Sequence, residues 1–182
     1  MLDFENEPII AAVRSDADLD RALHTELQTI FLLSSHILTV GDAAARAHAN
    51  GKLLFVHLDF ADGISKDAAG VQYLATKEID GIISTRSGII SAAKKSGLCT
   101  VQRFFMIDSR SVDTALESLR QVTPDMIEIM PGLACKSIAK IRESTRIPII
   151  AGGLIETKEE IFAALRAGAS MISTGKRELW ES

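Results

Sequence analysis

The stretch IPIIAGGLIETKEE, residues 147–160, decides the fold that we expect for this chain. A proline opens a short apolar run, two glycines end it, and a charged amphipathic segment follows. This order is typical of a buried strand that runs into a helix. A buried strand that finishes in Gly152 and Gly153 has no side chain to pack there, which indicates that something approaches the backbone closely.

Similar apolar runs recur along the whole chain, with amphipathic segments between them. We expect eight strands, at residues 8–13, 29–34, 52–59, 81–85, 99–105, 126–131, 148–153 and 170–175. Most residues in these runs are apolar, and strands of that kind are covered on both faces, as in a parallel sheet.

The segments between the strands carry helix signals. Helices are expected there, among them residues 16–27, 109–122 and 157–168. The first is predicted to begin with Asp16 as its N-cap, and the last with Thr157, followed by Glu160 as in a capping box. After the last strand, residues 176–182 leave room only for a helical stub.

Strands that each lead into a helix predict an α/β fold, a compact TIM-like (β/α)8 barrel of parallel strands that forms a single domain over residues 1–182. A doubly wound open sheet is the alternative. The likeness between GIISTRS, residues 81–87, and SMISTGK, residues 170–176, favours a closed barrel because the two lie half a barrel apart. Buried parallel strands resemble one another in any fold, so this repeat leaves both layouts open.

Composition and charge suit one soluble globular domain. The chain has 182 residues, of which 47% are hydrophobic, and no apolar run is long enough to span a membrane. Its two cysteines lack the spacing of a metal site, so we expect reduced thiols in a cytoplasmic protein. The net charge of −4 argues against nucleic-acid binding by the whole surface and leaves a local basic patch open.

The last two predicted strands end in residues that suit a phosphate group. In a barrel of this kind the binding face lies at the carboxyl ends of the strands. The predicted phosphate-binding residues are Gly152, Gly153, Ser173, Thr174 and Gly175. The glycines expose backbone N–H groups, the hydroxyls add donors, and the stub that follows would add its helix dipole. The alternative is that the glycines only turn a tight loop.

Charged and polar side chains on other strand ends are candidates for binding the rest of a ligand. We expect a small polyol to contact Asp59, Arg103, Glu128, His57 and Arg14. His57 and Asp59 lie two apart in one predicted strand and would share a face. Charges inside apolar strands are costly unless they are paired or bound, so Arg103 with Glu128 is alternatively a structural ion pair. His57 is alternatively a hydrogen-bonded core histidine.

The signal for catalysis is poor. No lysine lies in the carboxyl half of a predicted strand, where a Schiff base would form, and no residues are spaced for a metal. We therefore predict no catalytic residue, metal or cofactor, and favour a sensor of a phosphorylated metabolite. The alternative is a phosphosugar-binding barrel enzyme of the isomerase or lyase type, with Asp59 and Glu128 as its acid/base pair. A barrel kept for protein–protein contact is a third hypothesis.

Several segments together resemble a known family. They are KLLFVHLD (52–59), GIIST (81–85), QRFFMIDS (102–109), PIIAGGLI (148–155) and ISTGKRELW (172–180). From about Pro8 to Trp180 the chain resembles the glycerol uptake operon antiterminator regulatory protein family. The resemblance implies a small TIM-like barrel that senses glycerol 3-phosphate and acts on the leader mRNA of a glycerol catabolic operon, so that transcription passes a terminator.

Binding to that mRNA requires a basic surface on an acidic chain. The candidates are Lys136, Lys140, Arg142 and Arg146, of which Lys136 and Lys140 lie a helical turn apart. Such charges usually form a solvated helix face, and only the resemblance makes RNA worth proposing. The sequence is compatible with a homo-oligomer but does not fix one.

Overall fold

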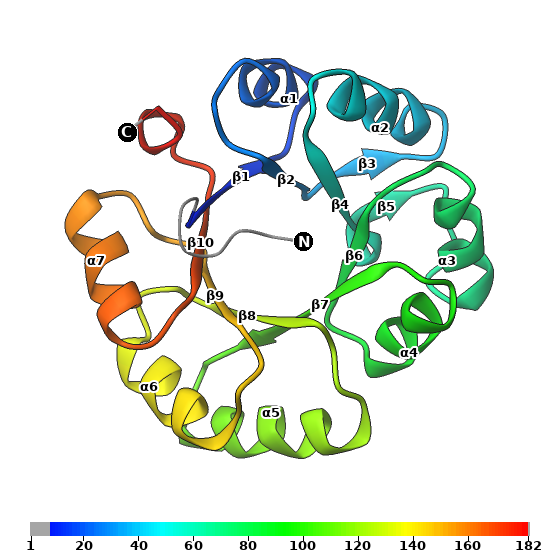
Figure 1. The fold of residues 1–182 in the computed structure, drawn as a ribbon. Helices are drawn as coiled ribbons and strands as arrows, with labels where there is room; N and C mark the ends of the chain where they lie inside the picture. The colour runs from blue at the N-terminus through cyan, green and yellow to red at the C-terminus, as the bar shows by residue number, and fades with distance from the viewer. Residues whose placement is uncertain (1–7, 182) are drawn as a thin grey trace.

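The computed structural model describes residues 8–181, which form a closed barrel of eight parallel strands (Figure 1). The barrel strands are β1 (Ile9–Val13), β2 (Thr29–Leu32), β4 (Leu53–His57), β6 (Gly81–Ser84), β7 (Cys99–Phe105), β8 (Met126–Met130), β9 (Ile149–Gly152) and β10 (Met171–Thr174). The first and last of them pair, with Ile10 beside Ser173, and this closes the ring. The predicted barrel is confirmed, and the open sheet is wrong.

Helices surround the barrel (Figure 1). They are α1 (Asp16–Leu23), α2 (Val40–Ala49), α3 (Ala68–Ala75), α4 (Ser87–Lys95), α5 (Ser109–Gln121), α6 (Cys135–Ser144) and α7 (Lys158–Arg166). After β10 comes only the 3-10 turn η2 (Arg177–Leu179), as the short tail predicted. No helix between residues 8 and 181 is long and apolar enough to cross a membrane. Residues 1–7 and 182 of the predicted domain lie outside the described residues.

Two predicted helix starts have different outcomes. The prediction for Asp16 is wrong, because Ser15 is the N-cap of α1 and its Oγ accepts the N–H of Asp18 at 3.1 Å. The capping box of α7 is confirmed: Thr157 Oγ1 accepts the N–H of Glu160 at 3.2 Å, and the Glu160 carboxylate accepts the N–H of Thr157 at 3.0 Å.

The predicted strand at residues 52–59 is too long. β4 ends at His57, and residues Leu58–Phe60 form the 3-10 turn η1. The prediction that Asp59 shares a strand face with His57 is therefore wrong. A two-stranded sheet of β3 (Ser35–His36) and β5 (Ala61–Asp62) was not predicted, because its strands are too short to produce a periodic pattern.

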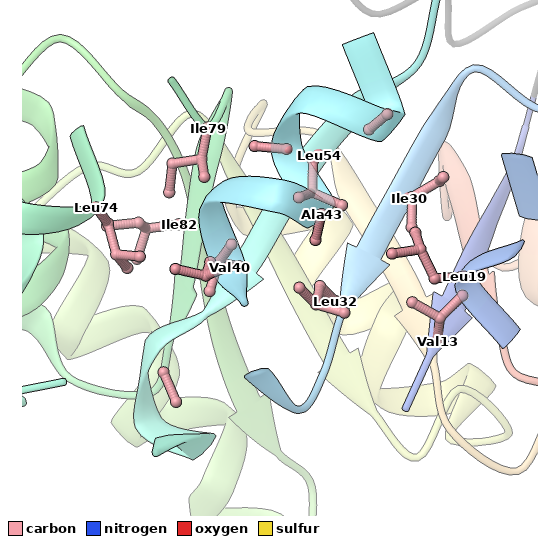
Figure 2. Close-up of a cluster of buried hydrophobic side chains, with 14 of the residues drawn as sticks. Val13, Leu19, Ile30, Leu32, Val40, Ala43, Leu54, Leu74, Ile79 and Ile82 are labelled. Carbon is pink, nitrogen blue, oxygen red and sulfur yellow. The ribbon is translucent and has the colours of Figure 1, made fainter. Parts of the chain in front are cut away.

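Apolar side chains bury both faces of the strands. On the outer face, Val13, Ile30 and Leu54 pack with helix residues such as Leu19 and Val40 (Figure 2). On the inner face, each barrel strand gives one side chain to a packed apolar layer: Ile10, Phe31, Phe55, Ile83, Val101, Met126, Ile150 and Met171. Burial on both faces is why these runs are apolar almost throughout.

A polar layer lies above this apolar one, nearer the carboxyl ends of the strands. Side chains on a strand alternate between its faces, so residues two positions further along also point into the barrel. On four strands these residues are His57, Arg103, Glu128 and Ser173, all buried, and on β9 the residue is Gly152. The barrel interior therefore changes from apolar to polar just below its mouth.

Candidate functional site at the barrel mouth

A cavity of about 330 Å³ opens at the carboxyl end of the barrel. Its lining comes from segments far apart in the sequence and includes Arg14, Arg103, Glu128, Gly153, Ser173, Gly175 and Lys176. The volume lies at the lower end of the range that small-molecule sites occupy. The structure therefore brings together six of the ten predicted phosphate and polyol contacts.

Barrel closure decides where Arg14 lies. Because β1 pairs with β10 in register, with Ala11 beside Thr174, the chain after β1 lies next to the chain after β10. Arg14 and Lys176 therefore line the same cavity as Gly153 and Gly175, which offer only main chain. This half of the cavity combines two cations and accessible backbone with the carboxylates of Asp18 and Glu156, and its cations and N–H groups are the part that suits an anion.

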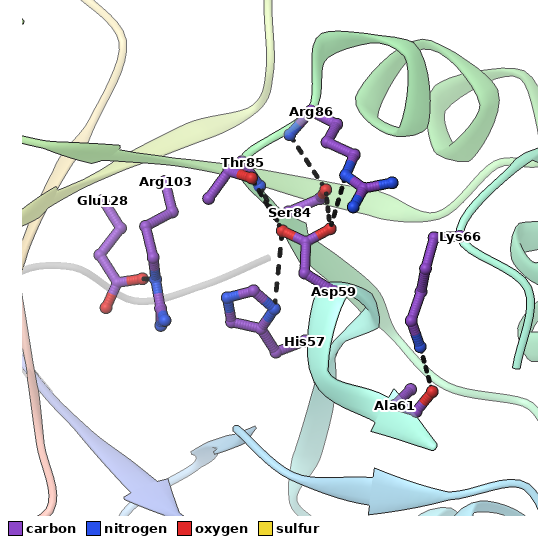
Figure 3. A network of polar contacts seen from close by, with 9 residues as sticks. All are labelled: His57, Asp59, Ala61, Lys66, Ser84, Thr85, Arg86, Arg103 and Glu128. Carbon is purple, nitrogen blue, oxygen red and sulfur yellow. Dashed lines mark hydrogen bonds and ion pairs between the residues drawn. The ribbon is translucent and has the colours of Figure 1, made fainter. Parts of the chain in front are cut away.

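The buried pair of Arg103 and Glu128 forms the floor of the cavity. Neighbouring strands place the two residues side by side, and Arg103 Nε donates to Glu128 Oε2 at 2.7 Å (Figure 3). Their side chains are 5% and 1% exposed. The two terminal nitrogens of Arg103 make no hydrogen bond to another described residue. The pair is thus a structural ion pair that still offers donors to a ligand.

The two glycines that end β9 have different tasks. A Cβ at Gly152 would overlap the carboxylate of Glu128, so this glycine makes room for the buried ion pair. Gly152 does not line the cavity, whereas Gly153 does. Gly153 has a φ of +76°, and a Cβ there would lie 2.6 Å from Cε of Met130. Only the second glycine opens backbone to a ligand.

Thr174 connects the two loops that carry the cavity glycines. Its Oγ1 donates to the carbonyl of Ile155 at 2.7 Å and accepts the N–H of Lys176 at 3.1 Å. The indole of Trp180 donates to the Thr174 carbonyl at 2.9 Å. From the sequence we expected Thr174 to donate to a phosphate. Its hydroxyl proton is already used in the bond to Ile155, so this side chain positions both loops instead.

The Thr174→Val variant should lose about 1–3 kcal/mol of unfolding free energy, because the buried carbonyl of Ile155 is left without its donor. Urea unfolding monitored by circular dichroism measures the loss. Thr76→Val is the matched control, since its hydroxyl donates to an exposed helix carbonyl that water can reach. Equal stabilities of the two variants would contradict the positioning role.

The helix dipole that was predicted after the last strand does not contribute to this site. The η2 turn after Gly175 has three residues, too few for the dipole that the sequence analysis invoked. At the start of α7, the carboxylate of Glu160 accepts the N–H groups of Glu156 and Thr157 at 2.7 and 3.0 Å. The available positive charge is therefore that of Arg14, Lys176 and Arg103.

Asp59 is held by Ser84, the last residue of β6, and by Thr85 in the loop that follows. Its carboxylate accepts hydrogen bonds from Ser84 Oγ at 2.8 Å, from the N–H of Thr85 at 2.8 Å and from Thr85 Oγ1 at 3.0 Å (Figure 3). Burial opposes ionisation, but these hydrogen bonds outweigh it and lower the pKa of Asp59. Glu128 lines the cavity and Asp59 does not, so the two carboxylates do not face the same ligand space. This weakens the acid/base pair of the enzyme alternative.

His57 lies between Asp59 and the Arg103–Glu128 pair (Figure 3). Both ring nitrogens are buried, and neither has a hydrogen-bond partner among the described residues. Nδ1 is 4.0 Å from Asp59 Oδ2, too far for a hydrogen bond. Burial and the nearby Arg103 charge lower the pKa of His57 to about 4. His57 is thus a neutral imidazole with unused donor and acceptor positions.

The low pKa of His57 makes stability depend on pH. The unfolded chain protonates this ring near pH 6.5, whereas the folded chain does so only near pH 4. The stabilisation is complete above pH 6.5 and is lost as the pH falls to 4, by about 3 kcal/mol for a shift of this size. The His57→Gln variant should lose correspondingly less stability between those two pH values. Parallel pH profiles of urea midpoints would contradict this assignment.

The predicted RNA-binding residues lie away from the cavity, on or just after α6. Lys136, Lys140, Arg142 and Arg146 are all exposed, while Ile138 and Ile141 bury the other side of the helix. The structure thus leaves all four cations exposed and does not test what they bind.

Some cavity residues carried no signal in the sequence. Asp18, Met130, Leu154 and Glu156 also line the cavity. Leu154 has a φ of +60°, which is uncommon for a residue with a side chain, and it remains 66% exposed. Asp18 lies in α1 and Met130 ends β8, whereas the other two lie in the β9–α7 loop, and nothing in the local sequence marks any of the four as a site residue. Across residues 8–181, no group of three or more His, Cys, Asp or Glu side chains is placed to hold a metal ion.

Comparisons with known proteins agree on one family. A family model described as glycerol-3-phosphate responsive antiterminator matches residues 9–180. A glycerol uptake operon antiterminator regulatory protein from Listeria monocytogenes has a solved structure with a TM-score of 0.94 and 34% identity, covering 98% of this chain and 97% of that one. An antiterminator-related protein from Thermotoga maritima has a TM-score of 0.86 and 32% identity, covering 96% and 98%.

One curated relative carries no functional description. It is a protein of Escherichia coli K12 described as uncharacterized protein YgcP. It is 36% identical over 174 residues, which cover 95% of this chain and 91% of that protein.

Proposed function

Because this chain belongs to the family of glycerol-3-phosphate responsive antiterminators, we propose that it binds glycerol 3-phosphate at the barrel mouth and acts on the leader mRNA of a glycerol catabolic operon. Membership confirms the resemblance seen in the sequence. The family is a regulatory one, so the chain is a regulator and not an enzyme. Because the proposed target is a nascent transcript, we place this protein in the cytoplasm.

The observation that carries the ligand proposal is the division of the mouth cavity into two halves. Arg14, Lys176 and the main chain of Gly153 and Gly175 line one half and suit a phosphate. Hydrogen bonds to a charged group contribute about 1.5–3 kcal/mol each, so a few of them hold a phosphomonoester. Ser173 adds a hydroxyl that makes no hydrogen bond to another described residue.

The floor of the cavity suits the glycerol end. Arg103 offers its two terminal nitrogens and Glu128 offers carboxylate oxygens, which are a donor and an acceptor set for neighbouring hydroxyls. His57, behind this pair, supplies an unused ring nitrogen if a hydroxyl reaches it. Of the predicted polyol contacts, Asp59 is left out, because the last residue of β6 and the residue after it occupy both its oxygens.

Calorimetric titration and thermal unfolding with glycerol 3-phosphate test this proposal. At a hundred times its dissociation constant, the ligand should stabilise the fold by about 2.7 kcal/mol. Glycerol and inorganic phosphate are the controls, and each should bind far more weakly because it fills one half of the cavity. A titration without heat, together with an unchanged melting temperature, would refute the ligand proposal.

We expect the exposed cations of α6 to contribute to RNA binding. Reversing two of them, in Lys136→Glu with Lys140→Glu, should weaken the complex with the leader transcript and reduce the salt dependence of its affinity. Ligand affinity should stay unchanged, because neither residue lines the cavity. A filter-binding titration over a range of salt concentrations measures both effects, and an unaltered RNA affinity would remove α6 from the proposal.

A further inference from the structure

Charge is divided unevenly around the barrel. Residues 81–147, which run from β6 to the end of α6 and its loop, contain ten Lys and Arg against six Asp and Glu, a net charge of +4. The whole chain carries −4, so the remaining residues carry −8. The positive part is continuous in space, because β6, β7 and β8 are neighbours and α4, α5 and α6 cover them (Figure 1).

Exposed apolar side chains gather on the loops at the mouth. Among the described residues, those on the mouth loops are Leu38, Phe60, Phe105, Ile107, Leu133 and Leu154. Three of them, Phe105, Ile107 and Leu133, lie in the positive part, and they are 49%, 88% and 43% exposed. Apolar side chains at such exposure, grouped together, mark a binding surface.

A second hollow lies at the start of α5 on this surface. It has a volume of about 370 Å³, and its lining includes Arg103, Phe105, Asp108 and Arg110. Arg103 also lines the mouth cavity, so one side chain borders both spaces. Arg110 forms no ion pair with another described residue, and its charge is free for a partner.

Main-chain hydrogen bonds connect this surface to the proposed phosphate loop. The N–H of Met106 donates to the carbonyl of Met130 at 2.7 Å, which joins the β7–α5 loop to the end of β8. The N–H of Gly132 donates to the carbonyl of Gly153 at 3.0 Å, which joins the β8–α6 loop to the cavity. Gly153 is therefore hydrogen-bonded directly to the residue before Leu133.

We propose that single-stranded RNA docks on the rim formed by Phe105, Ile107, Arg110, Leu133 and Lys136, with one unstacked base in the hollow against Phe105. This inference rests on the proposed function and assigns the surface that reads ligand occupancy. Unpaired bases stack on aromatic rings and on Arg, and nearby cations hold the backbone phosphates. Arg110 follows Ile107, and Lys136 follows Leu133, so each apolar loop has a cation beside it for the backbone phosphates of a polyanion.

Binding of labelled leader transcript of a glycerol catabolic operon, in the presence of glycerol 3-phosphate, tests the rim. Phe105→Ala should weaken RNA binding about tenfold, the loss of one stacked base. Arg110→Gln with Lys136→Gln should also weaken it and should lower the slope of affinity against salt by about one to two. Ligand affinity should be unchanged in both variants, because none of these residues lines the mouth cavity.

Leu38→Ala and Phe162→Ala are the matched controls. Both residues are exposed apolar side chains, at 83% and 56%, but they belong to the negatively charged remainder of the chain. RNA affinity of these two variants should equal that of the unaltered protein. Photo-crosslinking followed by peptide mass spectrometry should place the contact within residues 105–110 and 132–136.

The outcomes separate this inference from the proposed function. If the unaltered protein binds no leader RNA, the proposed action on the leader mRNA is refuted, and RNA docking on the rim is refuted with it. If it binds RNA but the rim variants bind equally well, or the crosslinks lie elsewhere, only the rim is overturned. If the rim variants instead convert a dimer to a monomer in sedimentation runs and leave RNA affinity unchanged, the surface is an interface between copies.

Discussion

The Arg103→Ala variant is expected to lose about 3–5 kcal/mol of unfolding free energy, the largest stability effect that we predict for a single substitution. Glu128 is 1% exposed and receives the Nε–H of Arg103 at 2.7 Å. Without Arg103 its charge would stay buried in the barrel with no cation beside it. A loss of this size is a large fraction of the stability of an ordinary domain.

A double-mutant cycle separates the ion pair from simple loss of packing. Glu128→Leu alone leaves Arg103 unpaired and should also destabilise the fold. The combination Arg103→Met with Glu128→Leu removes both charges and should recover much of the lost stability, while glycerol 3-phosphate binding stays lost because the floor donors are gone. Urea unfolding of the unaltered protein, Arg103→Met, Glu128→Leu and the double variant measures the cycle. Additive losses would show that the two residues are not coupled.

The Gly153→Val variant is expected to bind glycerol 3-phosphate at least about a hundredfold more weakly, a change of about 2.7 kcal/mol. A Cβ at this position lies 2.6 Å from Cε of Met130, which also lines the cavity, and the added methyls would occupy the proposed phosphate space. The φ of +76° adds backbone strain of about 1–3 kcal/mol. Calorimetric titration measures the affinity, and urea unfolding measures the strain.

Gly97→Val is the matched control for this substitution. Gly97 has the same φ of +76°, lies between α4 and β7 at the other end of the barrel, and has open space around its Cβ position. It should show the backbone strain without any change in ligand affinity. Full affinity in Gly153→Val would mean that the phosphate lies elsewhere.

Local patterns gave good predictions wherever a structure depends on neighbours in the sequence. The capping box of Thr157 and Glu160 formed as predicted, because its two hydrogen bonds span only three residues. The pairing of Arg103 with Glu128 followed from their places on neighbouring strands. The N-cap of α1 was misplaced by one residue because Ser15 and Asp16 are both good N-cap residues, and the sequence offers no means to choose between them.

Predictions that depended on where a residue points in the folded chain were less successful. Asp59 left the strand because β4 ended two residues earlier and its carboxylate was taken up at the end of β6, a contact between segments 25 residues apart. Gly152 proved to make room for Glu128, while Gly153 alone faces the cavity. Arg14, expected at the polyol, lies beside Lys176 on the proposed phosphate side.

By itself, the sequence determined the number and order of the eight barrel strands, the parallel barrel that they form, and the family to which the chain belongs. The strands and helices can be recognised from adjacent positions, because each carries its own hydrophobic period and its own capping residues. The tertiary structure alone decided which strand ends share a cavity. That choice is made when β1 pairs with β10, because closing the ring brings residues from the two ends of the chain to the same site.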